Sequence, residues 1–139
     1  RMVMTIIKTI TDIERIGDES EKIAHIADWL SAASTPNREK LIQHIDEMGM
    51  LVRNILREAL DAFVRMDCHA AVSTAKKDAE IDRFYVELLS ELTENIKTHP
   101  QDTEDFQSLI WVTRSLERIG DHSKNICEYV IYLVKGNVN

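Results

Sequence analysis

The 139-residue sequence is poor in the residues that break helices, in cysteine and in aromatics. It has four glycines, two prolines and two cysteines, and aromatic residues make up 6% of the chain. So few glycines and prolines are not typical of a disordered linker, and 44% hydrophobic residues can build a sizeable core. Cys68 and Cys127 form no Cys-x-x-Cys motif, so both are expected as reduced thiols. We predict one ordered, helix-rich protein.

Positive charge and long apolar runs are also scarce. The formal net charge is −7, and no basic run is long enough to follow a phosphate backbone, so no nucleic-acid partner is expected. For the same reason we expect no tight site for free phosphate, and cations are the natural partners of this surface. No apolar run approaches the roughly 18 residues of a membrane span, and the signal-peptide pattern is absent. We expect a cytoplasmic chain that meets a membrane only through partners.

One five-residue motif, Glu-Arg-Ile-Gly-Asp, occurs at residues 14–18 and again at residues 117–121. Flanking residues match at the same offset, pairing Ser20 with Ser123 and Ile23 with Ile126. This is an internal repeat of one helix.

The repeated motif is locally unfavourable in a helix. Its acidic residues, Glu14 with Asp18 and Glu117 with Asp121, lie four positions apart, so both carboxylates of a pair share one face and repel. The enclosed glycine costs roughly 0.5–1 kcal/mol against alanine, and is useful where a backbone or ligand approaches closely. Two unfavourable choices in one place mark a candidate functional site.

The apolar residues recur three and four positions apart, which predicts four helices. The first fades at residues 31–35, with Thr35 capping a second helix that begins at Pro36. Asp67 caps a third helix, His99 and Pro100 end it, and a fourth begins at Asp102 or Thr103 and stops at Gly136. The expected inward positions are, in helix order, Val3, Ile6, Ile10, Ile13, Gly17, Ser20, Ala24 and Ala27; Leu41, Ile45, Met48, Val52, Ile55, Ala59, Ala62 and Met66; Val72, Ala75, Ala79, Asp82, Val86, Leu89, Thr93 and Ile96; Phe106, Leu109, Thr113, Leu116, Gly120, Ser123, Cys127, Val130 and Val134.

The repeat predicts the architecture of an all-α protein. The last three helices form an antiparallel three-helix bundle at residues 35–139. The first helix, at residues 1–34, is the counterpart of the fourth and hence the last helix of an incomplete preceding bundle. Arg1 is followed at once by periodic apolar residues, so the sequence resembles a fragment that starts inside a helix. We expect the first helix to bury its apolar face as a fourth packed helix or in an exchanged dimer.

The acidic residues predict a cation site. Asp78 and Asp82 on the third helix can face Glu117 and Asp121 on the fourth, and their oxygens suit Mg, Mn, Fe or Zn, singly or in a multinuclear site. Asp82 falls in an inward position, where an unpaired carboxylate would need a cation. The alternatives are a solvated face balanced by lysine and arginine, a ferritin-like di-metal enzyme, and a purely structural helical bundle. The enzyme needs Glu-x-x-His, and no histidine here has Glu three positions before it.

The sequence resembles the PhoU family, regulators of phosphate-specific transport. Residues 6–18 are similar to the third helix of that family's first bundle, and the pairs Asp78/Asp82 and Glu117/Asp121 match the second bundle's acidic motifs. The resemblance covers essentially the whole sequence and implies metal ligands at these four residues and at Glu14 and Asp18, the latter two without their partner motif.

The resemblance also implies a function. It predicts a non-enzymatic, metal-binding adaptor that represses phosphate uptake and the phosphate-starvation response. The implied partners are the ATPase subunit of the phosphate ABC transporter and the phosphate sensor histidine kinase. We also expect a homodimer, because the first helix needs cover for its apolar face.

Overall fold

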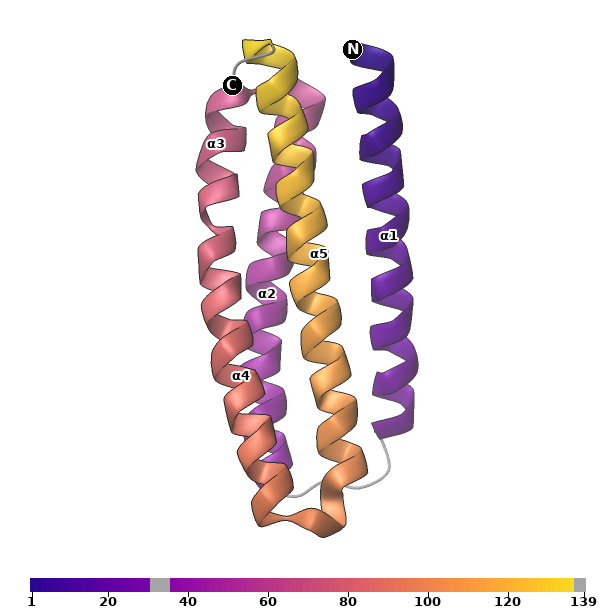
Figure 1. Cartoon of the computed structure of the whole chain (residues 1–139), viewed down its shortest axis with the longest axis vertical. Coiled ribbons are helices and arrows are strands. Elements are labelled where there is room, and N and C mark those ends of the chain that lie inside the picture. The colour runs from indigo at the N-terminus through magenta and orange to yellow at the C-terminus, as the bar shows by residue number, and fades with distance from the viewer. Residues whose placement is uncertain (31–35, 137–139) are drawn as a thin grey trace.

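The computed structural model describes residues 1–30 and 36–136, which form a bundle of long helices aligned side by side along one axis (Figure 1). The helices are α1 (Met2–Trp29), α2 (Pro36–Arg65), α3 (Cys68–Lys76), α4 (Asp78–Thr98) and α5 (Thr103–Lys135), with a short 3₁₀ helix, η2 (Pro100–Asp102). The all-α prediction is confirmed. Within these ranges no helix is long and apolar enough to span a bilayer.

The ends of the helices follow the predicted local signals. The side chain of Asp67 accepts a hydrogen bond from the backbone N–H of Ala70 at 3.0 Å and so caps α3. Gly136 follows α5 with φ at +77°, in the left-handed region that favours glycine. The predicted cap Thr35 and the predicted boundary between residues 34 and 35 lie outside the described residues.

Helix α5 is the centre of the fold, because it packs against α1, α2, α3 and α4. The inward positions predicted for residues 36–66 and 103–135 are confirmed, except that Met66 is half-buried and Val134 is 48% exposed. The core of fully buried large side chains includes Met48, Ile55, Ile81, Leu88, Leu92, Phe106, Ile126 and Val130. This core joins α2, α4 and α5 into the three-helix bundle.

The predicted inward face of residues 68–98 is wrong by one position. The buried residues are Ala71, Thr74, Asp78, Ile81, Leu88 and Leu92, whereas Asp82 and Val86 are exposed. Two apolar stripes lie one residue apart on this segment, and a turn at Lys77 separates α3 from α4. Periodicity alone does not decide which of two such stripes is buried. Packing against α2 and α5 buries the stripe that begins at Ala71, one position before the predicted stripe that begins at Val72.

The predicted inward face of α1 is also wrong. Helix α1 packs antiparallel on α5 through Thr5, Thr9, Asp12, Ile16 and Glu19 (Figure 1). Its apolar stripe is open, with Val3 69%, Ile10 51% and Ile13 44% exposed. The repeat explains the difference, because the matching stripe of α5 is covered by the bundle and α1 has no such cover among the described residues. The threonines are tolerated because each hydroxyl donates to a backbone carbonyl four residues earlier.

Candidate metal centre

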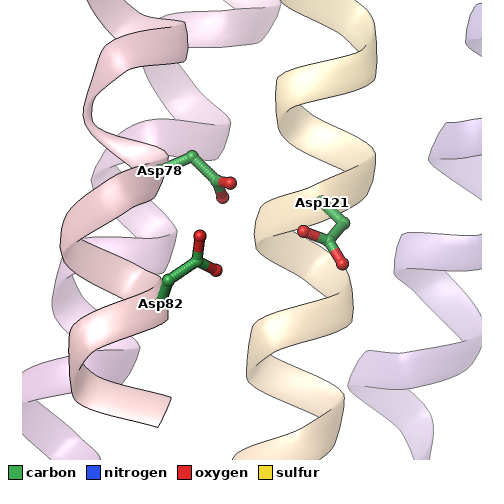
Figure 2. A group of neighbouring side chains, drawn as sticks. All are labelled: Asp78, Asp82 and Asp121. Atoms are coloured by element: carbon green, nitrogen blue, oxygen red, sulfur yellow. The ribbon is translucent and has the colours of Figure 1, made fainter. Parts of the chain in front are cut away.

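Three aspartates converge between α4 and α5. Asp78 and Asp82 extend from successive turns of α4 toward Asp121 on α5 (Figure 2). One carboxylate oxygen from each residue lies within 4.8 Å of the other two. Oxygens on opposite sides of one Mg or Ca ion, at ligand distances of about 2.0–2.6 Å, are about 4.0–5.2 Å apart. Modest side-chain rotation therefore brings all three oxygens to a single divalent cation.

Gly120 allows this approach of α4 to α5. A Cβ at that position would lie 2.7 Å from Cδ1 of Ile81 and 3.3 Å from Oδ1 of Asp78. The first distance is a steric clash with the end of the Ile81 side chain and the second a tight contact, so a larger residue would displace the Ile81 side chain, the Asp78 carboxylate or α4. Its repeat partner Gly17 has no described atom within 4 Å of the corresponding point. The close approach inferred from the sequence therefore exists in one copy of the motif.

Burial and, after it, mutual repulsion raise the pKa of two carboxyl groups in the cluster. Burial, followed by the charges of Asp82 and Asp121, raises the pKa of Asp78 from 3.8 to about 6. Burial, a hydrogen bond with Asp121 and the charges of the three aspartates raise the pKa of Glu117 from 4.5 to about 7. Glu117 therefore belongs to the same electrostatic cluster. A bound cation would release protons from these groups and relieve the repulsion.

The Asp78 carboxylate fits a hard cation. Oδ1 is buried and accepts no hydrogen bond from any described residue, although the residue is only 4% exposed. Lys124 is the one positive charge among the causes that shift its pKa. A buried carboxylate with an unused oxygen is costly without a cation or water. An all-oxygen ligand set suits Mg, Mn and Ca best and also accepts Fe or Zn.

The structure separates the six predicted ligands into two groups. Asp78, Asp82 and Asp121 meet, and Glu117 lies within their electrostatic reach. Glu14 and Asp18 are exposed on α1, and the cluster that can hold a cation does not include them. The inference that Asp82 occupies a core position is wrong: Asp82 is exposed, and Asp78 is the buried member of the pair. Metal binding at any of the six remains a prediction.

A second buried carboxylate, Asp12 on α1, was not foreseen from the sequence. Nδ1 of His122 lies 2.7 Å from its Oδ1, Nδ2 of Asn125 donates to Oδ1 at 3.2 Å, and the Tyr129 hydroxyl donates to Oδ2 at 2.7 Å. Burial and the Asp12 carboxylate raise the pKa of Tyr129 to about 12. These bonds hold α1 on α5. The internal repeat relates residues of the two helices but does not indicate that Asp12 contacts His122, Asn125 or Tyr129, so only the packing reveals these bonds.

Comparison with known proteins relates the chain as a whole to one family. A family model described as PhoU domain matches residues 45–130. A phosphate-specific transport system accessory protein PhoU homolog from Pseudomonas putida is 46% identical over 137 residues, which are 98% of this chain and 52% of that protein. The accessory protein PhoU from Serratia marcescens is 35% identical over 136 residues, covering 98% of this chain and 55% of that protein.

Two solved structures share the fold. A crystal structure of PhoU from Pseudomonas aeruginosa has a TM-score of 0.88 at 41% identity and covers 99% of this chain and 65% of that chain. The phosphate transport system regulatory protein PhoU from Streptococcus pneumoniae has a TM-score of 0.86 at 28% identity, with coverage of 99% and 63%. The chain spans about half the length of the curated relatives it matches.

Proposed function

The chain belongs to the PhoU family, and from this premise we propose that it serves as a cation-binding accessory protein of phosphate transport. The observation that carries the proposal is the convergence of Asp78, Asp82 and Asp121 within 4.8 Å, beside a glycine that keeps α4 close to α5. The raised pKa values of Asp78 and Glu117 support a cation, because the cluster is electrostatically strained without one. The proposed role is not enzymatic.

The regulatory part of the proposal follows the family. We propose repression of phosphate uptake and of the phosphate-starvation response, with the protein acting as a cytoplasmic homodimeric adaptor. Its partners would be the ATPase subunit of a phosphate ABC transporter and a phosphate sensor histidine kinase. The relatives' names, which describe accessory proteins of a phosphate-specific transport system, support the transporter side.

The cation would contribute charge neutralisation. Asp78, Asp82 and Asp121 would supply oxygen ligands, and Glu117 would add a fourth carboxylate or hold a proton beside them. Four acidic groups on two helices repel, so neutralising them draws α4 and α5 together and stiffens the bundle surface offered to a partner. The chain's own residues do no covalent chemistry in this scheme.

The cation proposal is tested by thermal unfolding of the chelator-treated chain with and without Mn or Mg. Ligand that binds only the folded state raises the melting temperature. The rise should be larger at pH 8 than at pH 5.5, because protons occupy Asp78 and Glu117 below their pKa values of about 6 and 7. An equal rise at both pH values would contradict binding at this cluster.

The internal repeat offers a matched control. Glu117→Gln with Asp121→Asn should remove the cation-dependent rise, whereas Glu14→Gln with Asp18→Asn makes the same change in the exposed copy of the motif and should preserve it. Loss in both double variants would mean that the rise does not arise specifically at the cluster between α4 and α5, and retention in both would mean that Glu117 and Asp121 are not needed. The partner side is tested by binding of the purified ATPase subunit to the immobilised chain, with Mn and with chelator. Equal binding of the ATPase subunit with Mn and with chelator would show that the adaptor role does not depend on the metal.

A further inference from the structure

A second polar site lies between α1 and α5, in a hollow of about 620 Å³. Its lining consists only of ionisable side chains: Arg15, Asp18, Glu19 and Lys22 from α1, with Arg118 and His122 from α5. None of them is a member of the Asp78, Asp82 and Asp121 cluster. The hollow therefore needs an explanation of its own.

The internal repeat accounts for the two arginines in the hollow. Arg15 and Arg118 occupy the same place in the two copies of the motif, and each directly follows its glutamate, so it cannot pair with that residue on the same helix face. The helices pack antiparallel through matching faces, since Ile16 and Ile119 are repeat partners and both are buried. An approximate twofold relation therefore brings one guanidinium from each helix to the same hollow.

The charges of the hollow differ from those of the rest of the chain. Arg15, Lys22 and Arg118 carry three positive charges against two negative ones on Asp18 and Glu19, while the overall net charge is −7. His122 is already engaged by Asp12. The local excess of positive charge, with two planar guanidinium groups, favours an oxyanion.

Glu19 determines which oxyanion fits. Its side chain is only 10% exposed, and Oε2 lies 3.4 Å from Nζ of Lys22 and 3.8 Å from Nη1 of Arg118. Its Oε1 is buried and accepts no hydrogen bond from any residue that the structure describes. A carboxylate with an unused oxygen repels a fully ionised anion but accepts a hydrogen bond from one that still carries a proton.

We propose that this hollow binds a phosphate group that retains one proton. The guanidinium groups of Arg15 and Arg118 and the ammonium group of Lys22 donate to the ionised oxygens, and the P–O–H group donates to the Glu19 carboxylate, which turns about its last side-chain torsion to meet it. Sulfate has the same shape but no proton at neutral pH, so it leaves the carboxylate unpaired and is disfavoured. With one net positive charge and an open site, the dissociation constant is expected to be on the order of 1 mM. This weak affinity agrees with the expectation of no tight phosphate site.

The test is an NMR titration of the ¹⁵N-labelled chain with inorganic phosphate, at constant ionic strength and with chelator present. Removing free cations keeps the acidic cluster out of the measurement, so this result is independent of the metal proposal. We expect saturable shifts at the hollow, and about tenfold weaker binding for Arg118→Gln or Arg15→Gln, the loss of one charge-assisted contact. Arg57→Gln, an equal charge change at an exposed position of α2, is the matched control and should bind as the unmodified chain does.

Two further arms test the proton and the source of the phosphate. Glu19→Gln should remove the preference for phosphate over sulfate. Glycerol phosphate, a monoester that loses its last proton at about pH 6, is compared with inorganic phosphate at pH 5.5, where both ligands carry a proton. Tighter binding of the monoester would assign the source to a phosphorylated molecule, and the reverse order would assign it to free phosphate. The proposal is overturned by a non-saturable phosphate response, by sulfate binding as tightly as phosphate, or by arginine variants that remain folded and bind normally.

Discussion

The two glycines of the repeated motif should respond in opposite directions to the same substitution. Alanine is favoured over glycine by about 1 kcal/mol in a helix interior, because glycine loses more backbone freedom on folding. At Gly17 a Cβ has no described neighbour within 4 Å. Gly17→Ala should therefore raise the free energy of unfolding by about 1 kcal/mol, which corresponds to roughly 3–4 °C in a domain of this size.

At Gly120 the same gain is opposed by a clash. The new Cβ would lie 2.7 Å from Cδ1 of Ile81, a residue with no exposed surface, and 3.3 Å from Oδ1 of Asp78. Such overpacking costs about 1–3 kcal/mol. Subtracting the helix gain leaves a net loss of up to about 2 kcal/mol, so the two variants should differ by about 1–3 kcal/mol.

Urea unfolding of both variants in chelator measures this difference, and the midpoint is the sensitive quantity because the slope should not change. The same samples with Mn should show that Gly120→Ala also weakens the cation effect, since it displaces Asp78. Equal stabilisation of the two variants would refute the close approach of α4 to α5 and, with it, the geometry of the proposed metal centre.

Two further changes test the buried carboxylates. Asp78→Asn should stabilise the metal-free chain at pH 8 by up to about 3 kcal/mol and should have little effect at pH 4. In the folded chain the pKa of Asp78 is raised from 3.8 to about 6, so the ionised carboxylate is disfavoured there. The unmodified chain therefore loses stability as the pH rises through 6, and the asparagine variant does not. A gain that is the same at both pH values, measured by urea unfolding in chelator, would contradict this assignment. Asp12→Ala should destabilise the chain by about 1–3 kcal/mol, because His122, Asn125 and Tyr129 lose their acceptor. Tyr129→Phe removes one of these hydrogen bonds and should cost about 1 kcal/mol. Unchanged urea midpoints in both variants would show that these bonds do not hold α1 on α5.

The sequence predicted local features of the candidate site better than its burial. The acidic spacing indicated a meeting of α4 and α5 that the structure shows for Asp78, Asp82 and Asp121, with Glu117 in electrostatic reach, because residues four apart share a helix face whatever the helix packs against. The spacing did not identify the buried aspartate on α4: Asp82 was expected to be buried, but Asp78 is buried and Asp82 is exposed. The choice depends on helix rotation of about 100° per residue, and two stripes one residue apart satisfy the same periodicity.

The sequence by itself determined the all-α class, the duplicated helix, the cap at Asp67 and the stop at Gly136, because each of these depends on spacing or on backbone conformation within a few residues. It also carried the resemblance to the PhoU family, which rests on comparison with known proteins and not on spacing. Only the tertiary structure decided which face of α1 is buried, that Asp12 meets Tyr129, and that Arg15 and Arg118 line one hollow. Identical motifs acquire different surroundings because the bundle covers the apolar stripe of α5, whereas α1 packs on α5 through the stripe one position before its own apolar stripe. Burial and electrostatics arise from these long-range contacts, and a periodic pattern does not carry that information.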